Sequence, residues 1–365
     1  MTRSKTLSAV TLGVSLAVRA AASPAGDPAL PPAPPTAESP HVGAGVLLHD
    51  QGDYDGAIRE YQKALDENPA DVVALYEMAF SYLAKKDCPQ AIAVAEKGLK
   101  VGHGYAASLY LVIGGCRDDL GDPKGAIAAY EAGIAAEPTT ALLHFNLGVT
   151  YSKLRDWRQA RLAYEKALFL DPAHASSHLG LAEVYEKDGY KVPALLALLR
   201  FLSLEPASER SRGALASVDR VFHAGVTPGE KPGDLTVTID SKAKTDEGDF
   251  GPLETGMLLA QAAQNAEQFE KTKSEPELTV GRLESQIGML AEGGDLKTPG
   301  FAARHYLPFF RQLQQKGLAR TFSYYVYQSS EVPGVSRWLA EHSKQVDDLK
   351  RWLAAPAAPA GMIRY

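Results

Sequence analysis

Histidine and carboxylate side chains are the groups in this chain whose spacing could support metal or acid–base chemistry. His174 and His178 are four residues apart, which on a helix would place two imidazoles on one side, as in many zinc sites. Neither an HExxH sequence nor a cluster of Cys with His accompanies this pair. Asp118 and Asp119 lie just before Gly121, a position typical of the polar end of a helix. We therefore predict no metal site and no cofactor.

Covalent catalysis and nucleotide binding need sequence patterns that this chain lacks. It has no GxSxG, and its glycine-rich places, 102–104 and 114–115, lack the Gly-Lys-Ser/Thr ending of a phosphate-binding loop. We therefore predict no catalytic residues and do not expect an enzyme. An unrecognised enzymatic or carrier activity in residues 253–354 is kept as an alternative.

The two cysteines, Cys88 and Cys116, permit two interpretations. Neither belongs to a CxxC sequence or adjoins a histidine, so neither indicates a catalytic thiol. In an oxidising compartment they could form a disulfide between neighbouring helix pairs. Alternatively, they are two buried thiols that pack as small apolar side chains.

Composition indicates a folded chain that does not bind nucleic acid. The chain has 365 residues, of which 45% are hydrophobic, so it can bury more than one core. Its formal net charge is −6, whereas nucleic-acid binding requires clustered Lys and Arg.

An internal repeat organises nearly half of the chain. Alanines recur at intervals of 34 or 35 residues, at Ala57, Ala91, Ala126, Ala160 and Ala194. Four residues after three of them comes a tyrosine, at Tyr61, Tyr130 and Tyr164, and twelve after four of them comes a proline, at Pro69, Pro138, Pro172 and Pro206. This pattern resembles the tetratricopeptide repeat, a helix–turn–helix unit. The second repeat lacks the proline, and the second and fifth lack the aromatic residue.

The resemblance implies an all-α fold, with a right-handed solenoid of five helix–turn–helix repeats over residues 38–208. Their expected bounds are 38–71, 72–105, 107–140, 141–174 and 175–208. A solenoid end needs a cap over its apolar face, and residues 209–224 supply a suitable helical pattern. We expect a linker at 225–252 with a short strand near Leu235–Ile239, then a smaller helical domain at 253–354 and a flexible tail at 355–365.

The first 22 residues have the pattern of an export signal. Arg3 and Lys5 precede an uncharged run, Leu7–Val18, and small residues follow at Ala20–Ala22. The run is too short to span a bilayer, so we expect no stable membrane span after cleavage. Residues 23–40 are rich in Pro and Ala and predict an extended tether. The expected location is a bacterial periplasm or the secreted fraction; the alternatives are a disordered start or a helix of the fold.

The resemblance also implies a binding groove along the first helix of each repeat. The residues expected to line it are Val42, Val46, Tyr76, Phe80, Leu83, Leu111, Gly115, Leu142, Phe145, Asn146, Val149, Leu179, Glu183 and Glu186. They make an apolar floor with acidic residues at the fifth repeat. Only Asn146 and Lys153 approach the residue types of a carboxylate clamp, so we predict against one. The alternative is that several of these side chains pack between neighbouring helices.

These features predict an exported, non-catalytic adaptor whose partner is a protein or peptide with apolar anchors. A second interpretation is an architectural protein whose groove is occupied by its own C-terminal domain or by a second copy; the sequence leaves the oligomeric state open. Gly115 follows Gly114 within a predicted helix, where each glycine costs about 1 kcal/mol relative to Ala. It either opens a notch for a ligand or simply weakens the helix.

Overall fold

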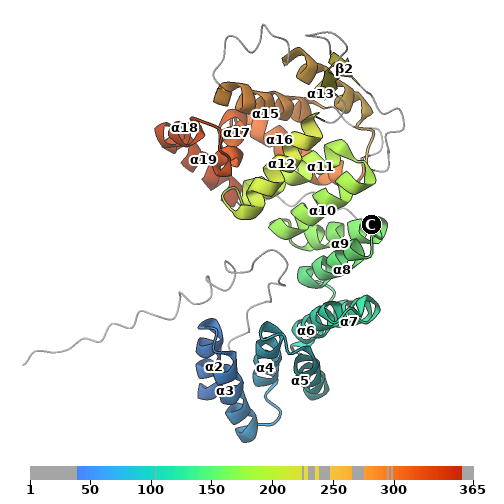
Figure 1. Cartoon of the computed structure of the whole chain (residues 1–365), viewed down its shortest axis with the longest axis vertical. Helices are drawn as coiled ribbons and strands as arrows, with labels where there is room; N and C mark the ends of the chain where they lie inside the picture. Colours follow the sequence, from blue (N-terminus) through green and yellow to red (C-terminus); the bar gives the residue numbers. More distant parts are fainter. Residues whose placement is uncertain are drawn as a thin grey trace, which may run out of the picture. The chain divides into compact units, whose positions relative to one another are not determined.

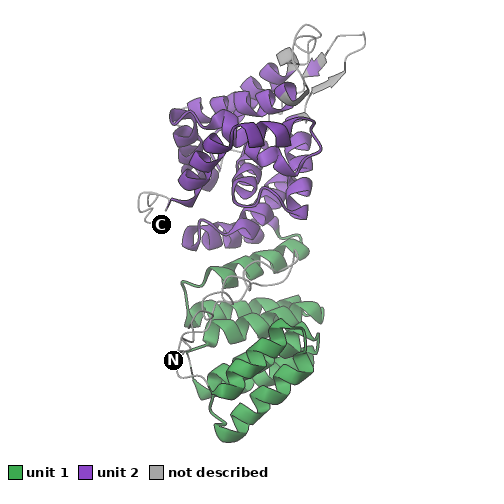
Figure 2. Cartoon of the chain, turned by 90° about the vertical axis from the view of Figure 1, so that its left-hand side faces the viewer, with its two compact units in different colours: residues 1–156 green, residues 157–365 purple. Residues whose placement is uncertain are grey.

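The computed structural model describes most of the chain between residues 39 and 355. The described residues are 39–102, 104–223, 226–228, 235–237, 247–264, 275–293, 296 and 299–355. The predicted export signal, all but the end of the tether, and the tail from residue 356 lie outside them. The chain divides into two compact units, residues 1–156 and 157–365 (Figure 2).

Unit 1 is a succession of antiparallel helix pairs (Figure 1). Its helices are α2 (Pro40–Asp50), α3 (Tyr54–Glu67), α4 (Val72–Ala84), α5 (Cys88–Val101), α6 (Ala106–Asp119), α7 (Pro123–Ala136) and α8 (Ala141–Lys153). Each of Asp53, Asp87 and Asp122 caps a second helix by accepting a hydrogen bond from a backbone N–H in its first turn. These caps end the turn inside each pair and set where the second helix begins.

The turn inside each pair requires a left-handed backbone at one recurring position. Gly52, Gly121 and Gly189 occupy it with φ of 81°, 75° and 83°. Lys86 and Arg155 occupy the equivalent places with φ of 64° and 59°, which side-chain-bearing residues adopt less readily. The turn geometry is therefore kept in all five repeats although only three have the glycine that suits it.

The two helices of a pair approach closely because a small residue on the first helix faces a tyrosine on the second. A Cβ atom placed on Gly45 would lie 2.4 Å from the ring of Tyr61, and one on Gly114 would lie 2.3 Å from the ring of Tyr130. Successive first helices, α2, α4, α6 and α8, also pack against one another, whereas the second helices make few mutual contacts. Within unit 1 the first helices therefore form the inner layer of a curved array.

Unit 2 continues with helix pairs and then adds the C-terminal helices. Its elements are α9 (Trp157–Leu170), α10 (Ala175–Asp188), α11 (Lys191–Leu204), α12 (Glu209–His223), β1 (Val226–Pro228), β2 (Leu235–Val237), α13 (Gly251–Gln264), α15 (Glu275–Glu292), α16 (Phe301–Gln315), α17 (Ala319–Val326), η1 (Tyr327–Ser329), α18 (Val335–Glu341) and α19 (Ser343–Ala354). The expected all-α fold with five helix pairs and a capping helix is confirmed, with one short antiparallel β-hairpin, β1–β2, added.

The C-terminal helices pack directly on the last repeat. Helix α11 contacts α10 and α12 from the repeat array, and α13, α16 and α17 from the C-terminal part. As a result α11 is buried on every side, including Leu195, Leu198 and Phe201. The division between compact units therefore falls between α8 and α9 and not at residues 225–252.

The expected linker at 225–252 is partly folded. Of its predicted strand, Leu235–Val237 is described, and it pairs with Val226–Pro228; residues 238 and 239 lie outside the described residues. At the end of this segment Glu247 and Phe250 are only 4% and 3% exposed. Glu247 forms an ion pair with Arg161 and accepts a hydrogen bond from the backbone N–H of Ala302, so it fixes the start of α16. The residues that Glu247 contacts are far from it in the sequence. Local composition does not reveal such contacts, so it predicted only a linker.

Candidate protein-binding surface

A row of aromatic rings crosses the inner layer of unit 1. His49 of α2 stacks on Phe80 of α4 with ring centroids 4.8 Å apart. Phe80 stacks in turn with Tyr76 at 6.3 Å, and Tyr76 packs against Tyr105 at 5.4 Å. The imidazole of His49 is held by a 2.7 Å hydrogen bond between its Nδ1 and Ser81 Oγ. The row is therefore fixed in place, with Phe80 partly exposed at its centre.

The predicted groove residues divide by burial. Five are buried against neighbouring helices and cannot contact a partner: Val42, Tyr76, Leu83, Leu111 and Asn146. Glu183 is exposed, and eight are partly exposed: Val46, Phe80, Gly115, Leu142, Phe145, Val149, Leu179 and Glu186. These five residues were predicted to line the surface, but the structure encloses them. Successive first helices lie close enough together to cover part of the inward-facing side of each helix.

Polar side chains at the third and fourth repeats are engaged within the protein. Lys153 Nζ lies 2.7 Å from Asp118 Oδ2, which also accepts a 3.2 Å hydrogen bond from Thr150 Oγ1. Asn146 Nδ2 donates to the carbonyl oxygen of Leu142. The two residues closest to a carboxylate clamp, Asn146 and Lys153, thus each have a partner within the protein.

Gly115 differs from its neighbour in the space around it. A Cβ atom on Gly114 would collide with the ring of Tyr130, whereas one on Gly115 would meet only Tyr130 Oη, at 4.0 Å. Gly114 is therefore required by the crossing of α6 and α7. No contact requires glycine at position 115, and the position is partly exposed, so the structure leaves room there for a ligand group.

The acidic end predicted at the fifth repeat is partly neutralised within unit 2. Arg220 Nη1 of α12 lies 2.8 Å from Glu186 Oε2, and Arg210 Nη1 donates to Ser176 Oγ. In each of these two contacts the residues are 34 positions apart, which is the period of the repeat. The capping helix α12 therefore occupies the position that the first helix of a further repeat would have. Sequence reasoning missed Arg220 and Arg210, although the 34-residue period extended into α12 would have found them. Only Glu183 presents an exposed carboxylate at this place.

The histidines four residues apart have separate structural roles. His174 caps α10 by accepting from the backbone N–H of Ser177. His178 is buried, with Nε2 3.0 Å from the carbonyl oxygen of Pro172 and Nδ1 2.9 Å from Tyr306 Oη. Burial, reinforced by His305 and Arg200, holds the pKa of His178 well below its usual range. A neutral ring that donates from Nε2 and accepts at Nδ1 fits this arrangement.

The two cysteines are free thiols in the structure, and the disulfide considered above stays a prediction. Both are buried, and the Cys116 thiol is hydrogen-bonded to the side chain of Cys88. Burial first, and then Cys88, raise the pKa of Cys116. A thiol that resists ionisation is a poor nucleophile, so its environment favours the packing role.

In the part of the chain that the structure describes, no three His, Cys, Asp or Glu side chains gather into a group that could hold a metal ion. No helix in the same part combines the length and apolar character needed to cross a membrane.

Comparison with known proteins identifies the repeats. The family described as tetratricopeptide repeat matches residues 48–111 and, separately, residues 141–174. The second match coincides with the bounds expected for the fourth repeat. The chain therefore carries tetratricopeptide repeats. No curated protein sequence matches the chain.

Several solved structures are similar to part of the chain. A crystal structure of MamA is 26% identical and covers 44% of this chain and 94% of its own, with a TM-score of 0.39. The thermophilic protein TTC0263 of Thermus thermophilus is 24% identical, covering 49% of this chain and 97% of its own, with a TM-score of 0.41. YrrB, described as a protein with an unusual peptide-binding site, is 20% identical and covers 49% of this chain and 91% of its own, with a TM-score of 0.39.

Proposed function

We propose that this tetratricopeptide-repeat protein is an exported, non-catalytic adaptor that binds a peptide or protein segment on the inner layer of unit 1. The observation that carries the proposal is the aromatic row centred on Phe80. A partly exposed ring held rigidly by His49 and Tyr76 loses little conformational freedom on binding and offers a large apolar contact. Residues Phe145 and Val149 of α8 extend the apolar surface to the fourth repeat.

The partner chemistry follows from which side chains are already engaged. Lys153 is paired with Asp118 and Asn146 with its own helix, so neither is left to grip a terminal carboxylate. The partly exposed surface residues Val46, Phe80 and Phe145 favour a partner with apolar anchors. A binding face of this kind has no need of a reactive group, which is why we infer an adaptor and not an enzyme.

Self-occupation of the surface is disfavoured at the fifth repeat. There the C-terminal helices pack on α11, the second helix of the pair. On the first helix, Leu179 is partly exposed and Glu183 is exposed. Within unit 2 the C-terminal helices reach the first helix through the hydrogen bond between Tyr306 of α16 and His178 of α10, and they leave Leu179 and Glu183 accessible.

Site-specific photo-crosslinking in the native host tests the proposed surface. A photoreactive amino acid in place of Phe80 is expected to yield a discrete adduct, whereas one in place of the exposed Lys97 on α5 is not. With the cross-linked partner purified, Phe80→Ala should weaken binding about 10- to 30-fold, as truncation of a central aromatic anchor does.

Phe169→Ala is the matched control, since Phe169 is 43% exposed on α9, outside the proposed surface. Equal loss in both variants, or none in either, would reject the surface. An adduct with a second copy of this chain would favour the architectural interpretation instead.

Export rests on the pattern of residues 1–22 and has its own test. Cell fractionation of the native host should recover the chain outside the cytoplasm, shortened at its N-terminus. Deletion of residues 1–22 should retain it in the cytoplasm. Recovery of the full-length chain in the cytoplasm alone would contradict export and leave the binding surface untouched.

A further inference from the structure

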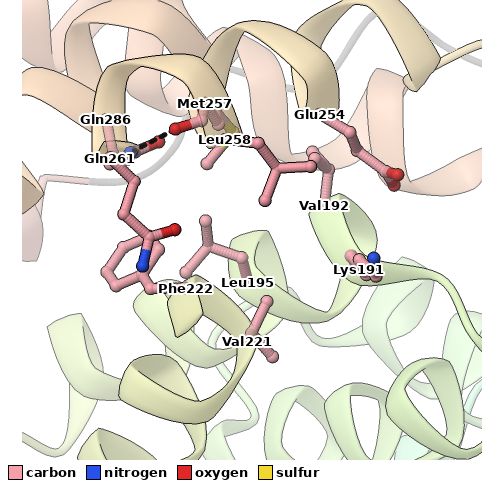
Figure 3. Close-up of a pocket in the computed structure, with 10 residues that line it drawn as sticks. All are labelled: Lys191, Val192, Leu195, Val221, Phe222, Glu254, Met257, Leu258, Gln261 and Gln286. Carbon is pink, nitrogen blue, oxygen red and sulfur yellow. Dashed lines mark hydrogen bonds between the residues drawn. The ribbon is translucent and has the colours of Figure 1, made fainter. Parts of the chain in front are cut away.

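A cavity of about 470 Å³ lies within unit 2, where α12, α13 and α15 meet η1 and the loop that follows it. A smaller and mainly apolar pocket adjoins it, and the two have Phe222, Gln261 and Gln286 in common. Figure 3 shows the smaller pocket, with Val192 and Leu195 of α11 facing Met257 and Leu258 of α13. Together they offer a chamber lined by both polar and apolar side chains, with a mainly apolar recess beside it.

Two glutamines in this cavity are buried with unpaired amide atoms. Gln261 is 6% exposed and Gln286 is 4% exposed. In the part of the chain that the structure describes, Gln261 Nε2 and Gln286 Oε1 have no hydrogen-bond partner. Gln286 Nε2 donates to the carbonyl oxygen of Met257 at 3.5 Å, which orients its Oε1 as an acceptor (Figure 3). The pair thus presents one free N–H donor and one free acceptor.

Packing alone does not account for these two side chains. A buried amide without a hydrogen-bond partner destabilises the folded state, and an apolar residue of similar size would avoid that cost. Their neighbours Val192, Leu195 and Leu258 are apolar, so leucine would suit the same surroundings. Polar groups kept unpaired in a cavity indicate that something else satisfies them.

We propose that this cavity binds an amide-bearing ligand, either one peptide unit of an extended segment or a small free amide. The carbonyl oxygen of the ligand accepts from Gln261 Nε2, and its N–H donates to Gln286 Oε1. Charges of both signs, from Asp219, Arg282 and Glu331, line the larger cavity, which suits a ligand without net charge. The apolar recess accepts a small apolar side chain next to the amide. This site is separate from the surface proposed for unit 1.

Titration of the full chain with two neutral probes tests the proposal. The probes are acetamide and an acetylated trialanine methylamide, followed through the side-chain NH₂ signals of Gln261 and Gln286 in ¹⁵N-labelled protein. Binding of either probe should shift both signals saturably. If the peptide binds at least about tenfold more tightly than acetamide, the site is assigned to peptide segments. If acetamide binds equally tightly or more tightly, the site is assigned to small amides.

Leucine substitutions of the two glutamines test whether the probes bind at this site. Gln261→Leu and Gln286→Leu should each weaken probe binding about tenfold, through loss of one hydrogen bond in a buried site. Gln314→Leu, on the exposed side of α16, should leave it unchanged. If a leucine variant fails to fold, the titration of the unchanged chain still decides. If neither probe shifts the side-chain NH₂ signals of the unchanged chain, the proposal is overturned and the cavity holds water only.

Discussion

The second helices of the repeats differ between the two units. In unit 1, α7 buries four of its 14 residues, all small or aromatic, and its remaining surface faces solvent to varying degrees. In unit 2, α11 buries 11 of its 14 residues and is apolar around its whole circumference. An amphipathic helix packs one side against the protein and exposes the other to solvent, whereas a helix that is apolar all round is buried on every side. The same repeat thus forms an open array in one unit and the floor of a larger helical domain in the other.

Loss of the ion pair that joins the repeat helices to the C-terminal segment should have the largest effect. Arg161 Nη1 and Glu247 Oε1 are 2.9 Å apart, and their side chains are 13% and 5% exposed. Glu247→Ala should destabilise unit 2 by about 3 kcal/mol, because it removes the nearer of the two carboxylates that pair with the buried guanidinium and leaves only Glu165, 3.8 Å from Arg161 Nε. Urea unfolding followed by tryptophan fluorescence measures this, since Trp157, Trp338 and Trp352 all lie in unit 2.

An exposed ion pair in unit 1 provides the control. Asp55 pairs with Lys85 at the surface, so Asp55→Ala should not measurably shift the unfolding transition followed by circular dichroism. The double variant Arg161→Leu, Glu247→Leu should recover most of the stability lost in Glu247→Ala. Equal destabilisation by Glu247→Ala and Asp55→Ala would refute the contrast between a covered and an open array.

Acid should weaken unit 2 through two histidines, His178, which is buried, and His305, which is partly buried. Burial, with Arg200 nearby, lowers the pKa of His305 from 6.5 to about 4, and burial lowers the pKa of His178 as well. Since the unfolded chain then binds protons first, this stabilisation is complete above pH 6.5 and is lost as the pH falls towards 4. His305 alone accounts for up to about 3 kcal/mol.

Urea unfolding at pH 7, 5.5 and 4.5, followed by tryptophan fluorescence, measures the acid effect. His305→Gln should flatten the pH dependence between pH 6.5 and 4, because it removes one of the groups that binds a proton on unfolding. A pH dependence as steep as that of the unchanged chain would argue against the role of His305.

Two adjacent glycines of unit 1 should give the smallest effects, with opposite signs. Gly114→Ala should destabilise unit 1 by about 1 to 3 kcal/mol, because its Cβ would overlap the ring of Tyr130. Gly115→Ala should stabilise it by about 1 kcal/mol, since alanine favours the helix and the site is open. Circular dichroism during urea unfolding measures both.

A larger side chain at Gly115 tests whether this position forms a notch for a ligand. Gly115→Leu should weaken binding of the cross-linked partner if a ligand group occupies the space beside Tyr130. Unchanged binding by Gly115→Leu, with Phe80→Ala as the positive control, would show that the glycine serves no ligand.

The sequence predicted the fold of the repeats well because its signals are local. The alanine period and the tyrosines four residues later placed the helix pairs, and the small residue at position 114 marked a close crossing of helices. The candidate surface was predicted less completely. Leu111 and Phe145 hold equivalent places in successive repeats, yet Leu111 is buried and Phe145 is partly exposed. That difference depends on the side chains of adjoining helices, which a repeat pattern does not specify.

By itself, the sequence determined the repeating helix pairs and the small and large residues at their crossings, because these depend on residues at most about one repeat apart. Tertiary structure decided which faces are covered. The hydrogen bond from Tyr306 to His178 joins residues 128 positions apart, and the pair of Arg161 with Glu247 joins residues 86 apart. Whether the side of a helix faces water or protein depends on such distant segments, and so do the unpaired amides of Gln261 and Gln286.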